Sequence, residues 1–232
     1  MKKLIIIPAY NEESNIEGTV EAILRDAPDF DYIIINDCST DNTREVCQRR
    51  GYRMLSLPIN LGIGGAVQTG YLYAQQYGYD LAVQIDGDGQ HNPAFLSRMS
   101  ETLERTKSQM VIGSRFIEKE GFQSSFARRI GIKYFTWLIK LLTGHLITDA
   151  TSGLRMVDRS LIERFAESYP DDYPEPETVV DALNNGFKVT ELPVIMNERQ
   201  GGVSSISTRK SIYYMIKVSL AILFVKLRGK MR

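Results

Sequence analysis

An apolar run in this chain stops abruptly at two carboxylates: Val83-Gln84-Ile85-Asp86-Gly87-Asp88-Gly89-Gln90-His91. The apolar part is typical of a buried strand, and Asp86 and Asp88 follow it with glycines beside them. Such a strand end can hold a hard divalent cation, which takes oxygen ligands and is shared with substrate phosphates. The alternative is a tight turn, because Asp and Gly are among the commonest turn formers. This stretch alone supports both interpretations equally.

The composition is that of an ordinary globular protein. The 232 residues suffice for one sizeable α/β domain or two small ones. Cys38 and Cys47 fit neither a metal-ligand spacing nor a disulfide framework, which indicates a reducing compartment. The apolar run that begins at Leu4 is too short for a signal peptide and ends at Pro8, so we expect it to form a first buried strand.

The net charge of zero hides a segregation of charge along the chain. Residues 121–148 and 199–232 hold 12 of the 28 basic residues and none of the 28 acidic ones, so the remainder is net acidic by 12. Such segregation indicates a face that meets something anionic. The basic residues alternate with aliphatic ones rather than with exposed stacking aromatics, which argues against a nucleic-acid partner.

The first half alternates between strand and helix candidates. We expect strands at Leu4–Ile7, Tyr32–Asn36, Arg53–Leu57, Leu81–Ile85 and Met110–Gly113. We expect helices at about Ser14–Asp26, Asp41–Gly51, Ile63–Tyr77 and Pro93–Thr106. Strands that are apolar throughout and alternate with helices predict a parallel sheet covered on both faces.

Three polar clusters follow these strands directly: Tyr10-Asn11-Glu12, Asp37 with Ser39 and Asp41, and Asp86-Gly87-Asp88. Ligands of parallel sheets bind beyond the carboxyl ends of the strands, so the clusters predict a single site and favour the metal interpretation. Ser14, Ser39 and Asp41 can also cap helices. The glycine-rich segment 60–66 could receive a phosphate at a helix N-terminus, or its glycines could serve close packing of that helix.

Taken together, the clusters resemble the family 2 glycosyltransferases of the GT-A fold, an α/β fold with a Rossmann-like, mostly parallel mixed sheet flanked by helices. The matching blocks are Ile7–Glu12, Ile35–Asp41, Asp86–His91, Gly113–Phe116 and Asp149–Arg155. The block at Asp86 has the form typical of the branch whose acceptor is a polyprenyl phosphate, such as dolichyl or undecaprenyl phosphate. The resemblance covers about residues 4 to 205.

The resemblance implies a role for individual residues. The nucleotide-sugar donor would be bound by Pro8, Ala9, Tyr10, Glu12, Asp37 and Asp86. A Mg²⁺ or Mn²⁺ ion that bridges the donor diphosphate would be ligated by Asp86, Asp88 and Gln90. The catalytic residues would be Asp88 and three arginines that hold the acceptor phosphate, Arg115, Arg129 and Arg199. Because Arg128 adjoins Arg129, either of the two could hold the phosphate.

Several positions depart from the family pattern. Asn36 replaces a carboxylate, and Ile63 stands where many relatives carry a lysine. The segment 173–177 replaces a more apolar block, and Glu175 or Glu177 could touch the sugar, orient an acceptor arginine or only support the helix. These changes leave the sugar open, although the resemblance favours UDP-glucose or UDP-N-acetylglucosamine over GDP-mannose.

Two helices are expected to be basic and amphipathic, at Phe126–Leu142 and Ser211–Lys226. The apolar run of the second, about 14 residues long, is too short to span a bilayer comfortably. Both could lie in the interface of an anionic membrane, or pack on the core or across a subunit interface. Related chains often add transmembrane helices beyond this point, so we expect a small membrane protein to supply any spanning element. A second copy of the chain is another candidate partner.

These observations predict a glycosyltransferase domain at 1–205, with a nucleotide-sugar half at 1–118 and an acceptor half at 119–205, followed by a membrane-interface helix at 206–232. The expected reaction is metal-dependent, inverting transfer of a sugar from a nucleotide to a polyprenyl phosphate, at the cytoplasmic face of the cell membrane. The acceptor is already an anion, so the reaction needs cations more than a strong base. The alternatives are extension of a saccharide acceptor and nucleotide-sugar binding without turnover.

Overall fold

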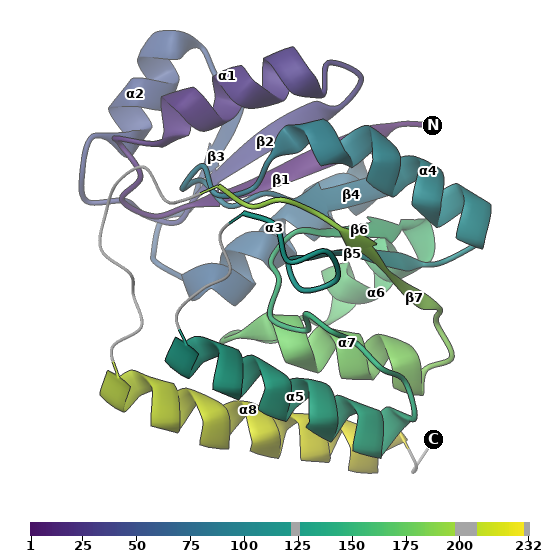
Figure 1. The fold of residues 1–232 in the computed structure, drawn as a ribbon. Coiled ribbons are helices and arrows are strands. Elements are labelled where there is room, and N and C mark those ends of the chain that lie inside the picture. The colour runs from purple at the N-terminus through teal and green to yellow at the C-terminus, as the bar shows by residue number, and fades with distance from the viewer. Residues whose placement is uncertain (122–125, 198–207, 230–232) are drawn as a thin grey trace.

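A computed structural model of the chain describes residues 1–121, 126–197 and 208–229 (Figure 1). Its centre is a seven-stranded sheet in the order β3-β2-β1-β4-β6-β5-β7. The first five strands in the chain are β1 (Lys3–Ala9), β2 (Asp31–Asn36), β3 (Met54–Ser56), β4 (Leu81–Gln84) and β5 (Met110–Ser114). Each lies within two residues of a predicted strand. For β1, β4 and β5 the reason is that a strand buried on both faces is largely apolar, whereas β3 is partly exposed at the edge of the sheet.

The two remaining strands make the sheet mixed. β6 (Arg155–Asp158) runs antiparallel between β4 and β5, whereas β7 (Val189–Pro193) runs parallel to β5 at the edge. Gln84 at the end of β4 therefore pairs with Arg155 at the start of β6. This confirms the expected mixed, mostly parallel sheet. The sheet runs through both predicted halves of the domain, so their division stays a prediction.

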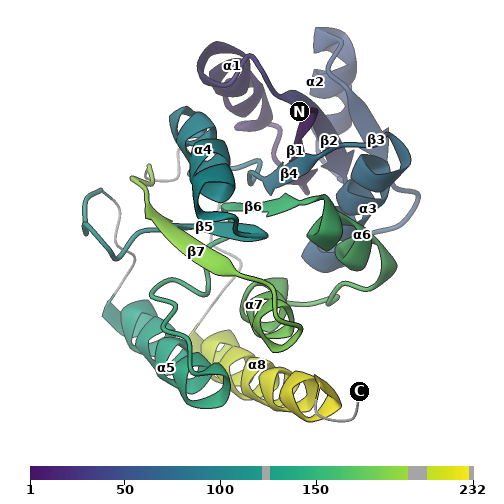
Figure 2. The same cartoon turned by 90° about the vertical axis from the view of Figure 1, so that its right-hand side faces the viewer.

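Helices cover both faces of the sheet (Figures 1 and 2). On one face Ile5 and Ile7 of β1 pack in a cluster with residues of α1 (Ile16–Asp26), α2 (Thr43–Arg50) and α4 (Leu96–Thr106). A short 3-10 turn, Pro93–Phe95, leads into α4. On the other face Leu4 and Ile6 pack with α3 (Gly62–Gln76), α6 (Arg159–Glu167) and α7 (Pro174–Asn184). The alternation of adjacent β1 residues between the two clusters follows from the pleat of the strand.

Two long helices form an outer layer beyond α7. α5 (Phe126–Thr143) and α8 (Thr208–Gly229) lie side by side, with their N-termini toward the same side of the molecule (Figures 1 and 2). The Tyr134 hydroxyl lies 3.0 Å from that of Ser219, and the Phe135 and Tyr214 rings meet edge to face. Both predicted helices therefore exist. Within the described residues, none of the helices combines the length and hydropathy that a bilayer crossing requires.

The glycine-rich start of α3 is explained by close packing. A Cβ at Gly64 would lie 2.0 Å from the carbonyl oxygen of Pro170 and 2.3 Å from that of Asp171. Further along α3, a Cβ at Gly70 would lie 2.2 Å from the side chain of Ile6. The absence of these side chains lets α3 approach both the sheet and the 170–171 backbone.

We predict that Gly64→Ala lowers the free energy of unfolding by roughly 1–3 kcal/mol, because the new methyl group meets backbone oxygens that have little room to move. The matched control is Gly18→Ala, at an exposed position of α1 where a Cβ meets nothing within 4 Å. That change should raise stability by roughly 0.5–1 kcal/mol through helix propensity. Urea denaturation of both variants measures the difference, and equal effects would refute the packing explanation.

Candidate active site

Three loops meet at the carboxyl edge of the sheet, as the strand order requires. Two hydrogen bonds from backbone N–H groups connect the loop after β1 to the loop after β2. The Asn11 backbone N–H donates to Ser39 Oγ at 3.0 Å, and the Glu12 backbone N–H donates to Thr43 Oγ1 at 2.8 Å. The loop after β4 contacts the first one, since a Cβ at Gly87 would lie 3.3 Å from the Pro8 carbonyl oxygen. The predicted polar clusters therefore lie together.

The predicted donor-binding residues after β1 differ in accessibility. Pro8 and Ala9 are buried at the end of the strand, whereas the Tyr10 side chain is 48% exposed. Glu12 accepts a hydrogen bond from the side chain of Asn15 at 2.7 Å. Tyr10 and Glu12 thus have accessible side chains at this edge of the sheet, whereas Pro8 and Ala9 are buried beneath them at the end of β1.

Asp37 is engaged with the start of α3. Its carboxylate accepts the N–H groups of Leu61 at 2.7 Å and Gly62 at 2.9 Å, and the Gly64 N–H donates to the Asp171 carbonyl at 3.1 Å. A carboxylate at a helix N-terminus is stabilised by the helix dipole. Because these N–H groups already have protein acceptors, the packing interpretation of the glycine-rich segment is favoured over the phosphate one.

The carboxylate of Asp86 is oriented by its neighbours. Gln84 Nε2 donates to Asp86 Oδ1 at 2.8 Å, and the Asp86 backbone N–H donates to His91 Nδ1 at 3.0 Å. Since Nδ1 of His91 accepts, the neutral ring carries its proton on Nε2, which lies 3.8 Å from Asp86 Oδ2. A Cβ at Gly153 would lie 3.0 Å from Asp86 Oδ2, so the glycine lets the backbone of this loop approach the carboxylate closely.

Asp88 is 8% exposed, and its Oδ1 accepts the Gln90 backbone N–H at 3.0 Å. The Gln90 carbonyl in turn accepts the Asn197 N–H at 2.9 Å. The described residues contain no group of three or more His, Cys, Asp or Glu side chains arranged to hold a metal. Two carboxylates and an amide oxygen nevertheless fit Mg²⁺ or Mn²⁺, which take hard oxygen ligands and complete their coordination with water and substrate phosphate.

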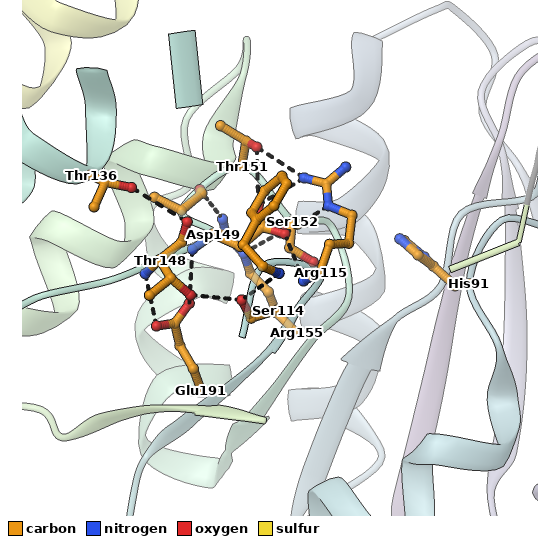
Figure 3. A network of polar contacts seen from close by, with 12 residues as sticks. His91, Ser114, Arg115, Thr136, Thr148, Asp149, Thr151, Ser152, Arg155 and Glu191 are labelled. Carbon is orange, nitrogen blue, oxygen red and sulfur yellow. Dashed lines mark hydrogen bonds and ion pairs between the residues drawn. The ribbon is translucent and has the colours of Figure 1, made fainter. Parts of the chain in front are cut away.

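Arg115 forms a buried, bidentate ion pair with Asp149 (Figure 3). Its Nε donates to Asp149 Oδ2 and its Nη2 to Oδ1, each at 2.7 Å, and Nη2 also lies 3.1 Å from Thr151 Oγ1. The side chains of Arg115 and Asp149 are 13% and 0% exposed. Arg115 is therefore held in one orientation and is not an ordinary surface charge.

Glu191 of β7 fixes the segment that carries Asp149. Its carboxylate accepts the backbone N–H groups of Thr148 and Asp149, both at 2.8 Å, and the Thr148 hydroxyl at 2.9 Å. Burial raises the pKa of Glu191, and these hydrogen bonds act in the opposite direction. Figure 3 shows the resulting chain of contacts from Glu191 through Asp149 to Arg115.

The Arg155 guanidinium is buried and surrounded by neutral acceptors. It donates to the carbonyls of Ser152 and Ala150, each at 2.7 Å, to that of Glu175 at 2.5 Å and to Thr178 Oγ1 at 2.7 Å. One side chain thus holds the 150–152 loop against the first turn of α7.

The other predicted arginines lie toward the edge of the described region. Arg129 is exposed in the first turn of α5. Arg199 falls outside the described residues, as does the side chain of Arg128. The assignment of the acceptor phosphate to these residues therefore stays a prediction.

Sequence reasoning did not assign roles to Asp149, Arg155 and Glu191. The first two belong to the block Asp149–Arg155, so that block could have pointed to them. For Glu191 the sequence offers only a weak indication, which is that it is the single acidic residue in the short strand Val189–Pro193.

We predict that Asp149→Asn lowers the free energy of unfolding by about 3–5 kcal/mol, because it leaves a buried guanidinium without its charged partner. The control is Asp29→Asn, since Asp29 pairs with Lys3 but is 51% exposed, and such surface pairs contribute about 0–1 kcal/mol. Denaturant titration of both variants is the measurement. A loss of less than 1 kcal/mol in Asp149→Asn would contradict the proposed importance of the buried pair.

Comparison with known proteins identifies the family. The family model described as Glycosyl transferase family 2 matches residues 4–165. The chain is 28% identical over 228 residues to the polyprenol monophosphomannose synthase of Mycolicibacterium smegmatis, which covers 94% of this chain and 86% of that protein. It is also 28% identical over 210 residues to the UDP-N-acetylglucosamine–dolichyl-phosphate N-acetylglucosaminyltransferase of Methanococcus voltae, with coverages of 82% and 83%.

Among solved structures, the chain resembles the glucosyl-3-phosphoglycerate synthase of Mycobacterium tuberculosis crystallised with Mn²⁺, UDP-glucose and phosphoglyceric acid. The TM-score is 0.73 at 19% identity, and the match covers 97% of this chain and 79% of the other. At this identity the similarity defines the fold, which is the GT-A fold.

Proposed function

The chain belongs to glycosyl transferase family 2, and we propose that it transfers a sugar from a nucleotide donor to a polyprenyl phosphate. The names of the relatives from M. smegmatis and M. voltae refer to polyprenol and to dolichyl phosphate, which supports this class of acceptor. The product would be a lipid-phosphate-linked sugar of the kind consumed in cell-envelope glycan synthesis.

The observation that carries the proposal is the proximity of a carboxylate loop and a fixed arginine. Gly153 lies against Asp86, and four residues earlier in the same loop Asp149 holds Arg115. Carboxylates that bind a metal–diphosphate and an arginine that binds a phosphate would thus face one space. Arginine suits this role because a guanidinium is always charged and forms strong, charge-assisted hydrogen bonds to phosphate oxygens.

In the proposed reaction a phosphate oxygen of the acceptor attacks C1 of the donor sugar. The bond from C1 to the diphosphate oxygen breaks, and the electron pair leaves with the nucleoside diphosphate. One displacement inverts the configuration at C1, and the anionic acceptor needs no general base. Arg115, already oriented by Asp149, would hold the acceptor oxygens without further ordering, which lowers the entropic part of the barrier.

The donor diphosphate would be bound with Mg²⁺ or Mn²⁺, held by Asp86, Asp88 and Gln90. The bound ion would stabilise the charge that develops on the leaving diphosphate. The Mn²⁺ and UDP-glucose in the similar M. tuberculosis structure, and the UDP donor in the name of the M. voltae relative, support a metal and a UDP-sugar. We therefore place UDP-glucose or UDP-N-acetylglucosamine before GDP-mannose as donor.

We further propose that the protein binds the membrane surface through an α5–α8 apolar face. This face consists of exposed apolar side chains on two adjacent helices: Ile130, Trp137 and Leu141 of α5, and Ile216, Leu220, Leu223 and Phe224 of α8. Apolar residues that remain exposed together on one surface mark an interaction site. The exposed Lys133 and Lys140 of α5 would favour an anionic lipid surface.

The inner side of α8 attaches the helix to the rest of the protein. Val218 and Ile222 are buried, Lys217 pairs with Asp172, and Lys226 Nζ donates to Asn184 Oδ1 at 3.0 Å. Packing on α7 therefore fixes α8 and leaves its apolar side facing outward. Cys38 and Cys47 are free thiols, which is compatible with the reducing, cytoplasmic side of a membrane.

The decisive assay combines a panel of nucleotide sugars with Mg²⁺ or Mn²⁺ and a short polyprenyl phosphate. We expect Asp88→Ala to lose activity by more than about 100-fold, because charge stabilisation at the leaving group contributes several kcal/mol. Asp29→Asn, at the exposed ion pair with Lys3, should retain wild-type activity.

Product formed only with a saccharide acceptor would replace the lipid-phosphate proposal with saccharide extension. Binding of the donor without either product or metal-dependent donor hydrolysis would indicate a non-catalytic module. An active Asp88→Ala variant would refute the metal role of this loop.

We predict that the double variant Leu220→Gln, Phe224→Gln sediments with anionic liposomes at least tenfold less than the wild type, since burial of each side chain is worth about 1.5–3 kcal/mol. The control is Leu72→Gln, an exposed leucine of α3 outside the α5–α8 apolar face. The thermal midpoints should stay equal, because both changed α8 residues are exposed. Undiminished sedimentation of the double variant would refute the membrane-binding role of this face.

A further inference from the structure

Glu175 lies in the first turn of α7, close to the loop that touches Asp86. Its carbonyl accepts a hydrogen bond from Arg155 Nη1 at 2.5 Å, and the same guanidinium donates to the Ser152 carbonyl at 2.7 Å. Ser152 precedes Gly153, which lies against the Asp86 carboxylate. One guanidinium therefore fixes the backbone of Glu175 relative to Ser152 and Gly153, which lie beside the Asp86 carboxylate.

The Glu175 carboxyl group interacts electrostatically with both sides of the proposed reaction. Burial raises its pKa, Arg155 and Arg115 act to lower the pKa, and Asp86 acts to raise it. Asp86 belongs to the donor side and Arg115 to the acceptor side. The Glu175 carboxyl group therefore interacts electrostatically with both groups, in agreement with the contact of its backbone with Arg155 beside the 150–153 loop.

The same carboxylate is accessible and has spare hydrogen-bonding capacity. Its side chain is half-buried, although the surrounding protein is dense enough to desolvate it. Within the described part of the chain it accepts a hydrogen bond from its own backbone N–H and from no other residue. A desolvated carboxylate with unfilled acceptor positions is a binding group for hydroxyl donors.

The neighbouring acid Glu177 faces elsewhere. Two residues along a helix correspond to a rotation of about 200°. Burial raises the pKa of Glu177 too, but its charged neighbours are Asp181, Asp171 and Lys217. Glu177 also lines a cavity of about 270 Å³ with Arg164 and Tyr169, on the flank formed by α6, α7 and α8. It is therefore a matched control on the same helical turn.

The position of Glu175 indicates which part of the substrates would lie beside its carboxylate. In a transfer between a donor diphosphate and an acceptor phosphate, the group that lies between the two is the sugar. A residue that senses both Asp86 and Arg115 lies near that group. Free hydroxyls of a sugar are donors that a carboxylate accepts strongly.

We propose that Glu175 is the residue that selects the donor sugar, by accepting hydrogen bonds from hydroxyl groups of a neutral pyranose. This inference rests on the proposed function and names the substrate class of the same site. The negative charge of Glu175 also rejects donors whose sugar carries a carboxylate, because like charges brought together are strongly unfavourable.

The test uses Glu175→Gln and Glu175→Ala, with Glu177→Gln as the matched control, and the best donor of the panel. A hydrogen bond to a charged group is worth about 1.5–3 kcal/mol, so kcat/KM for this donor should fall roughly 10- to 100-fold in Glu175→Ala. Calorimetric affinity for UDP alone, with Mn²⁺ present, should stay within about twofold. Glu177→Gln should match the wild type in both measurements.

Two donor series give readouts that general loss of structure would not produce. With donor analogues that each lack one hydroxyl, the wild type should lose activity with at least one analogue, and Glu175→Ala should show no further loss with that analogue. With UDP-glucuronic acid, Glu175→Gln should show a higher rate relative to the neutral donor than the wild type does.

The proposal is overturned if every missing hydroxyl affects Glu175→Ala as much as the wild type, or if Glu177→Gln behaves like Glu175→Gln. It is also overturned if the Glu175 variants lose UDP affinity, since the residue would then act on the nucleotide. These outcomes are separate from failure of the proposed function, which Asp88→Ala and the acceptor panel report on their own.

Discussion

The site depends on the hydrogen bonds that the buried guanidinium of Arg155 donates. Its four acceptors come from the 150–152 loop and from the first turn of α7, and its own strand is paired with β4 beside the Asp86 loop. Each acceptor is a neutral oxygen, so the guanidinium donors are satisfied without a direct ion pair, and the Glu175 carboxyl group interacts with the charge from nearby. Arg155 therefore helps to fix the 150–152 loop, which lies beside Asp86 and the Arg115–Asp149 pair, relative to Glu175.

The sequence was sufficient to predict the first five strands, β1 to β5, and insufficient to predict β6 and β7. The strands β1, β2, β4 and β5 are apolar along their length, which a strand covered on both faces requires. β6 is a four-residue strand that contains Arg155 and Asp158, and nothing in its local composition distinguishes it from a loop. Its position between β4 and β5 follows from pairings and hydrogen bonds with residues far away in the chain. The chain of contacts from Glu191 to Arg115 is likewise absent from any local pattern.

Two ambiguous features were resolved by tertiary contacts. The glycines at the start of α3 suited either a phosphate or close packing, and the decisive contact is with the backbone of residues 170–171, more than a hundred positions away. The basic residues of the C-terminal helix suggested a charged membrane face, but Lys217 and Lys226 turn inward to α7. Among the α8 side chains that the structure describes, Ile216, Leu220, Leu223 and Phe224 are the exposed apolar ones. The glycine-rich segment is thereby explained by packing, whereas the membrane role of α8 stays a proposal.

The balance of charge in the site bears directly on metal dependence. Asp149 pairs with Arg115, and the Glu175 carboxyl group interacts with Asp86 and with the guanidinium groups of Arg155 and Arg115. Burial raises the pKa of Glu175 and of Glu191, because it disfavours the charged form of each carboxyl group. A donor diphosphate and an acceptor phosphate would add more negative charge to the same space. In the proposed reaction a divalent cation between the carboxylates and the substrate phosphates would offset this negative charge, which is the physical reason for proposing metal-dependent transfer.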